Sequence, residues 1–275
     1  MHTFYIVSLK SDIQRRTHIE KMFNSLDILF QFFDAVNKQN LSDILNQYPI
    51  KFKENSLTQG EQGCFMSHYL LWQKMLDKNI PYMIIAEDDV ILSRKTHTML
   101  DNLDKIMEQC DILKFETMQM PVLVDNDCDI IEGICKLKEL ASEHWGTAGY
   151  VITNEMAKEL CQRLSKESIK KPVDHILFDD AVKTYKIYQT IPGLAIQEDV
   201  LNRNTNMITL HSSLEEERKK RRRKVAKNKV SREFKRLLSQ LKPEYWRLKR
   251  REKYIKKNGV IIPFDNQSLT KDVTQ

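Results

Sequence analysis

Three consecutive carboxylates, Glu87-Asp88-Asp89, directly follow the apolar run at residues 82–86. Such a run is typical of a parallel strand buried on both faces, and ligands of open α/β sheets bind beyond the carboxyl ends of these strands. Because adjacent carboxylates repel one another, the cluster favours a divalent cation that carries a phosphorylated ligand, and oxygen donors suit Mg²⁺ or Mn²⁺. The alternative is an ordinary strand end whose solvated acids cap the next helix.

The elements around these acids alternate between strand and helix. Asp12 is expected to cap a helix that carries Ile19, Met22 and Phe23 on one face. Strands are predicted over residues 4–9, 30–33, 82–86, 112–115, 149–152 and 185–191, and further helices over residues 61–76, 155–164 and 176–183. This alternation predicts an α/β domain with a largely parallel sheet.

The composition indicates a soluble protein of a reducing compartment. The chain has 275 residues, of which 41% are apolar and 30% charged, and no stretch approaches the roughly 20 apolar residues that span a bilayer. Its first residues lack a basic leader, so export by a signal peptide is not expected. The five cysteines form no CxxC pair, which favours the cytoplasm.

Charge divides the chain into two parts. Residues 214–259 hold 20 Lys+Arg and 6 Glu, a net charge of +14, against −8 for the remainder. We therefore expect one domain over residues 1–213 and a basic C-terminal tail over residues 214–275. Apolar and aromatic residues recur within the tail, which suits a basic helix on an anionic membrane surface. A solvated tail is the simpler alternative, and nucleic-acid binding is the less favoured one.

Five blocks of sequence, in order, resemble the motifs of glycosyltransferase family 25, which includes lipooligosaccharide galactosyltransferases. They extend over about residues 4–200. The blocks are YIVSL with Arg15-Arg16, LTQGEQGCFMSH at 57–68, IAEDDV at 85–90, GTAGY at 146–150 and PVD at 172–174. The third block departs from the family's usual LEDDV, because Ala86 stands where leucine is usual.

The resemblance implies a Rossmann-like GT-A fold and an inverting transfer, commonly of galactose from UDP-galactose. It makes the acid triplet the equivalent of a DXD motif, with Asp89 as a direct metal ligand and Glu87 or Asp88 near the metal or the ribose. His211 follows the late loops, where such enzymes often supply another metal ligand. The resemblance also places Ser8, Gly146 and Thr147 at the donor.

An inverting transfer needs a base to accept the proton of the acceptor hydroxyl. Asp174, which follows Pro172, is the first candidate, and Asp180 is the second. Asp174 could equally be the N-cap of the helix expected over residues 176–183.

The helix at residues 61–76 and the two arginines are candidate donor contacts. Gly63 lets the backbone approach a phosphate or sugar closely, and His68 shares a helical face with Cys64. The alternative for His68 is a structural histidine of the core. Arg15 and Arg16 could pair with the diphosphate or be solvated.

Together these features predict a metal-dependent, peripheral enzyme on the inner face of the bacterial inner membrane. It would move galactose from UDP-galactose onto a lipid-linked oligosaccharide of lipopolysaccharide. The alternative is a non-catalytic sugar-nucleotide-binding module, tethered to a membrane or to RNA by its tail.

Overall fold

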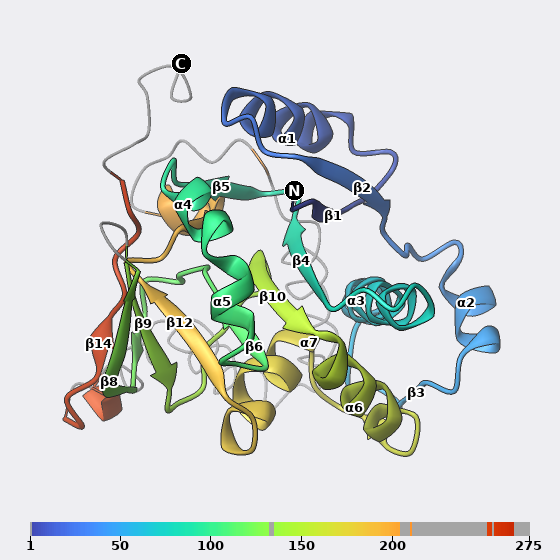
Figure 1. Cartoon of the computed structure of the whole chain (residues 1–275). Helices are drawn as coiled ribbons and strands as arrows, with labels where there is room; N and C mark the ends of the chain where they lie inside the picture. The colour runs from blue at the N-terminus through green and yellow to red at the C-terminus, as the bar shows by residue number, and fades with distance from the viewer. Residues whose placement is uncertain (1, 132–134, 204–209, 211–251, 255, 267–275) are drawn as a thin grey trace, which may run out of the picture.

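The computed structural model describes residues 2–131, 135–203, 210, 252–254 and 256–266 (Figure 1). Its centre is an eight-stranded sheet of order β2-β1-β4-β10-β6-β12-β9-β8. The strands are β1 (Phe4–Ser8), β2 (Phe30–Asp34), β4 (Tyr82–Glu87), β6 (Ile112–Lys114), β8 (Val124–Ile131), β9 (Cys135–Leu140), β10 (Gly149–Thr153) and β12 (Ile187–Ile191). The α/β, Rossmann-like class expected from the sequence is confirmed.

Six of these eight strands run in the same direction, and β9 and β10 oppose them. β1 is parallel to both β2 and β4, and β12 is parallel to β6. β10 lies antiparallel between β4 and β6, with Gly149 opposite Ala86, and β9 lies antiparallel between β12 and β8. The largely parallel sheet that we expected is therefore interrupted at its centre. As a result, the start of β10 lies at the same sheet edge as the carboxyl ends of β1, β4 and β6.

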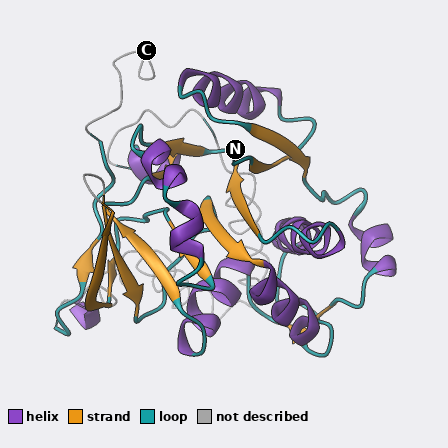
Figure 2. Ribbon diagram, in the orientation of Figure 1, coloured by secondary structure: helices purple, strands orange, loops and turns teal. Residues whose placement is uncertain are grey.

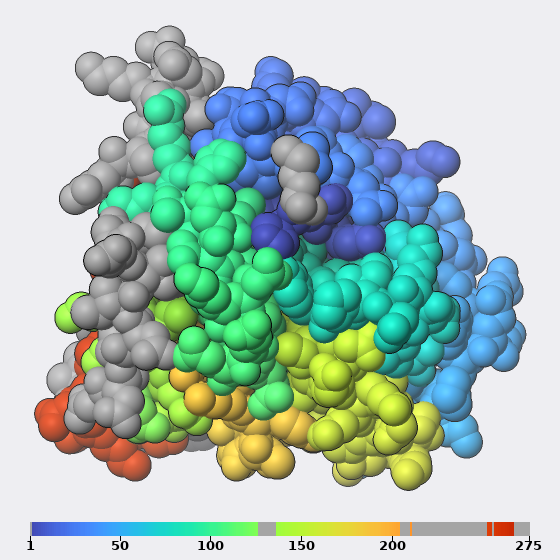
Figure 3. Space-filling model, viewed as in Figure 1, coloured from blue at the N-terminus to red at the C-terminus, as the bar shows by residue number. Residues whose placement is uncertain are grey.

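Helices cover both faces of the sheet (Figure 2). α3 (Gln59–Asp77) and α6 (Asn154–Leu164) pack on one face, and α1 (Ile13–Ser25), α4 (Thr96–Asp101) and α5 (Leu103–Met107) pack on the other. Ile85 points into the first layer, whereas Ile84 and Ala86 point into the second. This double burial explains the unbroken apolar run of β4. In the space-filling view, α5 (green) and α6 (yellow-green), which cover opposite faces of the sheet, lie next to each other at the surface (Figure 3).

Side-chain caps fix where α1 and α3, which carry Arg15 and His68, begin. Asp12 caps α1 as predicted, since its carboxylate accepts a hydrogen bond from the backbone N–H of Arg15 at 3.2 Å. α3 starts with a capping box, in which the hydroxyl of Thr58 accepts from the Glu61 N–H and the Glu61 carboxylate accepts from the Thr58 N–H. These caps determine which residues of each helix face the sheet edge.

The single helix predicted over residues 176–183 is wrong. The segment forms one turn of α7 (Val173–His175), the π-helical turn η1 (Ile176–Asp180) and the 3₁₀ turn η2 (Ala181–Lys183). Phe178 interrupts the helical geometry, with φ −124° and ψ 16°. This kink buries Phe178 edge-on against the ring of Tyr150, with 6.0 Å between centroids. Core packing thus overrides the local helical pattern.

Short elements complete the domain. β3 (Lys51–Phe52) pairs with β11 (Ser168–Ile169), and β5 (Val90–Leu92) pairs with β13 (Ala195–Gln197). α2 (Leu41–Gln47) precedes β3, and α8 (Glu198–Leu201) follows β13. Among the described residues, none of the helices has the length and apolar character needed to cross a bilayer.

The described end of the chain belongs to this domain. β14 (Val260–Ile261) pairs antiparallel with β7 (Pro121–Val122). Figure 1 shows β14 in the part of the molecule that holds β8 and β9. The Thr117 hydroxyl donates to the Ile262 carbonyl at 2.7 Å. The expected boundary at residue 213 therefore needs correction for residues 252–266, because their apolar side chains fill space in the core. The basic amphipathic stretch predicted within residues 214–251 lies outside the described residues.

Truncation of one side chain in this terminal segment tests its contribution to stability. Ile262 is completely buried, whereas its neighbour Ile261 is 44% exposed. We expect Ile262→Ala to lower the free energy of unfolding by about 2–5 kcal/mol, because it leaves a cavity. Ile261→Ala should change it by no more than about 0.5 kcal/mol. Urea denaturation of the full chain measures both free energies of unfolding. If Ile262→Ala changes this free energy as little as Ile261→Ala does, the terminal segment does not stabilise the domain.

Candidate active site

The acid triplet lies at the carboxyl end of β4. Glu87 is the last residue of this strand, and Asp88 and Asp89 form the turn into β5. The three side chains are only 20%, 8% and 14% exposed, in that order. Consecutive, poorly solvated carboxylates raise one another's energy, so the fold must supply positive charge or hydrogen-bond donors.

Arg15 supplies positive charge to the triplet from α1. Its Nη1 donates to Asp88 Oδ1 at 2.5 Å, and its Nη2 lies 3.3 Å from Asp89 Oδ2. Burial lowers the pKa of Arg15, but attraction to these two carboxylates outweighs burial and raises the pKa above its ordinary value. Arg16 lies elsewhere on the same edge, where it pairs with Asp34 and donates to the Ser8 carbonyl at 3.2 Å. Contact of either arginine with a diphosphate stays a prediction.

Asp89 has the properties of a metal ligand. Burial raises its pKa well above the usual range, Arg15 opposes this rise, and repulsion from Glu87 and Asp88 adds to it. Its Oδ1 is buried and has no hydrogen-bond partner among the described residues. A buried oxygen without a donor, in a cluster of carboxylates, fits a hard divalent cation. The residues present therefore suit the predicted ion, with Asp89 and Glu87 as ligands, while His211 lies outside the described residues.

A buried chain of polar groups leads from α3 to Glu87. The indole N–H of Trp72 donates to the Tyr150 hydroxyl at 3.2 Å, and this hydroxyl lies 2.8 Å from His68 Nδ1. His68 Nε2 lies 3.5 Å from Glu87 Oε1. Burial raises the pKa of Glu87, but His68, Thr147 and Arg15 outweigh it and hold the pKa below its ordinary value. The structure thus places the wholly buried His68 behind an acid of the triplet.

The loop before β10 completes this edge of the site. The Thr147 hydroxyl donates to Glu87 Oε1 at 2.5 Å. Gly146 has φ +86°, and a Cβ at this position would lie 2.3 Å from Glu116 Oε1. Glycine is therefore required at residue 146, both for the backbone conformation and for the close approach of Glu116. Of the two predicted donor residues of this loop, Thr147 contacts the acid triplet, and Gly146 is its neighbour in the loop.

Lys114 and Glu116 bind the backbone of this loop. Neither residue was identified from the sequence. They are completely buried. Lys114 Nζ lies 2.9 Å from Glu116 Oε2 and donates to the Gly146 carbonyl at 2.7 Å. Glu116 Oε2 accepts from the Ala148 N–H at 3.0 Å. The local pattern did not point to them, because β6 ends at Lys114 and Glu116 lies beyond the strand, so it is the tertiary contacts with residues 146–148 that reveal their role.

Asp174 joins the same loop from α7. Its Oδ2 accepts from the Gly146 N–H at 3.3 Å, and its Oδ1 accepts from the His175 N–H at 3.0 Å. Asp174 lies inside α7, and the N-cap of the turn that begins at Ile176 is His175, so the alternative role of Asp174 as the N-cap of the helix expected over residues 176–183 is wrong. Thr147, the next residue of the loop after Gly146, binds Glu87. This arrangement brings the first candidate base to the edge that holds the acids.

The other predicted residues have different surroundings. Asp180 accepts from Lys171 Nζ at 2.7 Å, and the described residues show no contact between Asp180 and the acid triplet. A Cβ on Gly63 would lie 2.5 Å from the Val36 carbonyl oxygen, so this glycine allows α3 to pack closely on the chain after β2. Ser8 is buried, and its hydroxyl helps to stabilise the Asp88 carboxylate.

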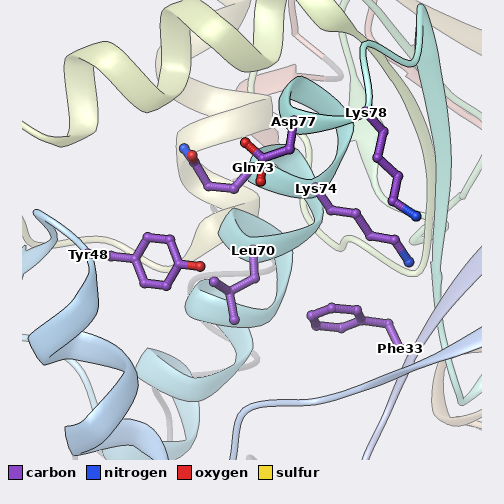
Figure 4. Close-up of a pocket in the computed structure, with 7 residues that line it drawn as sticks. All are labelled: Phe33, Tyr48, Leu70, Gln73, Lys74, Asp77 and Lys78. Carbon is purple, nitrogen blue, oxygen red and sulfur yellow. The ribbon is translucent and has the colours of Figure 1, made fainter.

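A separate groove of about 280 Å³ lies along the outer side of α3 (Figure 4). None of its lining residues belongs to the predicted site. They are Phe33, Tyr48, Leu70, Gln73, Lys74, Asp77 and Lys78. The groove is therefore not the place where the acids act.

Comparison with known proteins agrees with the resemblance seen in the sequence. A family model described as Glycosyltransferase family 25 (LPS biosynthesis protein) matches residues 1–177. The lipooligosaccharide biosynthesis protein lic2B of Haemophilus influenzae is 37% identical over 231 residues, which cover 80% of this chain and 84% of that protein. The lacto-N-neotetraose biosynthesis glycosyltransferase LgtE of Neisseria meningitidis serogroup B is 34% identical over 255 residues, covering 85% and 88%. The match contains the acid triplet, the 146–150 block and Asp174.

Proposed function

The chain belongs to glycosyltransferase family 25 and is a glycosyltransferase, and from this premise we propose which transfer it performs. It moves a hexose onto a terminal sugar of bacterial lipooligosaccharide or lipopolysaccharide. The proposed donor is UDP-galactose, and the transfer inverts the configuration at the anomeric carbon of galactose. The names of its relatives support the lipooligosaccharide acceptor. The choice of galactose rests on the family resemblance.

The observation that carries this proposal is the buried oxygen of Asp89, which lacks a donor within an acid cluster at the carboxyl end of β4. Asp89 and Glu87 would hold a divalent Mn²⁺ or Mg²⁺ ion there. When bound, the ion stabilises the negative charge that develops on the departing nucleoside diphosphate. Arg15 fixes Asp88 and one oxygen of Asp89, so the second oxygen of Asp89 is held in place.

Asp174 is the proposed base. Its carboxylate lies against the Gly146 N–H, in the loop that also binds Glu87 through Thr147. One short loop therefore sets the position of the base relative to the acids. In this role Asp174 accepts the proton of the acceptor hydroxyl as that oxygen attacks the anomeric carbon.

Release of UDP from a panel of UDP-sugars tests the reaction. We expect release from one donor with an oligosaccharide acceptor in Mn²⁺ or Mg²⁺, and none in EDTA. Asp174→Asn, assayed alongside, should lower kcat while the KM for the donor is kept. If the protein binds a donor but transfers to no acceptor, the non-catalytic binding module becomes the better proposal. Equal release in EDTA would contradict the metal dependence.

We place the enzyme at the inner face of the inner membrane, held by the basic segment within residues 214–251. The acceptor is amphiphilic, and basic residues bind anionic headgroups with about 1 kcal/mol each. Deletion of residues 214–275 is a poor test of this proposal, because it also removes the buried Ile262. A change confined to the basic run keeps the described terminal segment.

Neutralising the seven consecutive basic residues 218–224 should abolish cosedimentation with anionic vesicles. Each lost charge removes about 1 kcal/mol of headgroup attraction, while the site residues are untouched. UDP release with a soluble acceptor should therefore continue. Sedimentation with phosphatidylglycerol vesicles, and with neutral vesicles as a control, measures the effect. Unchanged sedimentation would refute the proposed membrane contact.

A further inference from the structure

A second set of metal-ligating atoms lies next to the acid triplet. Cys64 and His68 are four residues apart on α3, so they project from the same face of the helix on successive turns. They face Glu87 at the end of β4. One donor atom from each of these three residues lies within 4.8 Å of the other two. We propose that Cys64, His68 and Glu87 form a binding site for a transition-metal ion of the Zn²⁺ class.

The spacing of the donor atoms fits a tetrahedral ion. With bonds of about 2.1 Å to nitrogen and oxygen, tetrahedral angles separate the two ligand atoms by about 3.4 Å. His68 Nε2 and Glu87 Oε1 are 3.5 Å apart. The corresponding separation for a thiolate is about 3.6 Å, and the thiol of Cys64 lies within 4.8 Å of the other two ligand atoms. The fourth position is left for water or a ligand.

The surroundings of the histidine are those of a metal ligand. His68 is completely buried, and its Nε2 lies 3.5 Å from Glu87 Oε1, with no shorter hydrogen bond to any of the described residues. Its other nitrogen is held by the Tyr150 hydroxyl, which Trp72 in turn holds. Such a partner on the second nitrogen fixes the ring orientation of a metal-bound histidine. The spacing of four residues on one helix face is also that of the two histidines in the zinc-binding H-E-x-x-H motif, with Cys64 in the first position here.

Ligand chemistry separates this site from the hard ion proposed at Asp89. A thiolate with an imidazole selects Zn²⁺ or Co²⁺ over Mg²⁺, whereas carboxylates alone suit Mg²⁺ or Mn²⁺. Glu87 is common to the two sets. If the proposed function holds, on which this step rests, Zn²⁺ at Cys64 and His68 withdraws Glu87 from the donor site and inhibits transfer.

Titration of the metal-free full chain with Co²⁺ tests the site without any assay of activity. We expect a thiolate-to-cobalt charge-transfer band in the near ultraviolet that saturates at one equivalent and disappears when Zn²⁺ is added. Cys64→Ser should abolish the band, and His68→Ala should weaken binding at least tenfold. Cys161→Ser is the matched control, because this buried thiol lies on α6 and should leave the band unchanged.

Two results would overturn the proposal: absence of the band in the folded wild-type chain, or its persistence in Cys64→Ser. Circular dichroism of each variant establishes that it is folded. Asp89→Asn should keep the cobalt band, since this residue is not a ligand of the second site. Failure here is distinct from failure of the transfer proposal, which is decided by metal-dependent UDP release.

Discussion

Asparagine in place of Asp89 is expected to remove most transferase activity and to raise the stability of the metal-free protein. The substitution keeps the shape of the side chain but removes the charge on the buried oxygen proposed to bind the ion. Loss of one preorganised electrostatic contact to a developing negative charge typically lowers kcat by about 10²–10³. UDP release in saturating Mn²⁺ measures this loss.

The gain in stability follows from the pKa of the same carboxylate. Burial and repulsion raise the pKa of folded Asp89 above that of the unfolded chain. The folded state therefore holds the proton more tightly, and ionisation of Asp89 at neutral pH costs stability. Asparagine avoids this cost. The stability difference between variant and wild type should be largest at neutral pH and close as the pH falls through the raised pKa of Asp89.

Asp101→Asn is the control, because this carboxylate is exposed at the end of α4. It should change neither activity nor melting temperature. If Asp89→Asn keeps its activity, the acids are an ordinary strand end and the metal site is wrong. If it loses activity because it unfolds, the melting temperature in EDTA will fall instead of rising.

The position of the acids could be predicted because it depends on local sequence. The buried strand, the cap at Asp12 and the order of the motifs can all be read from short segments. An unbroken apolar run is typical of a strand buried on both faces, so β4 could be assigned with few alternatives. The end of that strand then determines the position of Glu87. The side chains that hold the acids are harder to predict, because Arg15 and Asp88 are 73 residues apart and meet only through the sheet.

Three errors have the same physical origin. Phe178 interrupts a helical pattern because its ring fills space beside Tyr150. Ile262 belongs to the core although strongly basic sequence precedes it, since its neighbours pair with β7. Lys114 was passed over because lysine is seldom buried, and only tertiary contacts show that its charge is matched. In each case long-range packing, which no local pattern encodes, decides the outcome.

Methionine in place of Lys114 is expected to cost about 3–5 kcal/mol of unfolding free energy, because it leaves Glu116 buried without its partner. The loss includes a hydrogen bond to the Gly146 carbonyl and the contact of Nζ with the Phe178 ring, 4.1 Å from its centroid. Lys183→Met is the control, since this lysine is 73% exposed. Urea denaturation should show a large shift for the first variant and little change for the second.

Removing the charge of Glu116 as well should recover part of the unfolding free energy that Lys114→Met loses. Burial raises the pKa of Glu116 from 4.5 to about 7, although Lys114 opposes this. The folded state then binds the proton more tightly between these values, so the stability contributed by Glu116 is lost as the pH rises from 4.5 to about 7. Lys114→Met/Glu116→Gln should therefore be more stable than Lys114→Met at neutral pH, and its stability should depend less on pH across this window.

The activity of the double variant shows whether the Lys114–Glu116 pair positions the loop at residues 146–148 or only stabilises the fold. Lys114 and Glu116 hold Gly146 and Ala148, and the residue between them carries the hydroxyl that binds Glu87. In the double variant part of the lost stability should return, but Gly146 still lacks its lysine donor. We expect a raised KM for the donor and a lower kcat in a folded protein. Wild-type kinetics in that variant would show that the buried pair stabilises the domain without positioning Thr147 or Asp174.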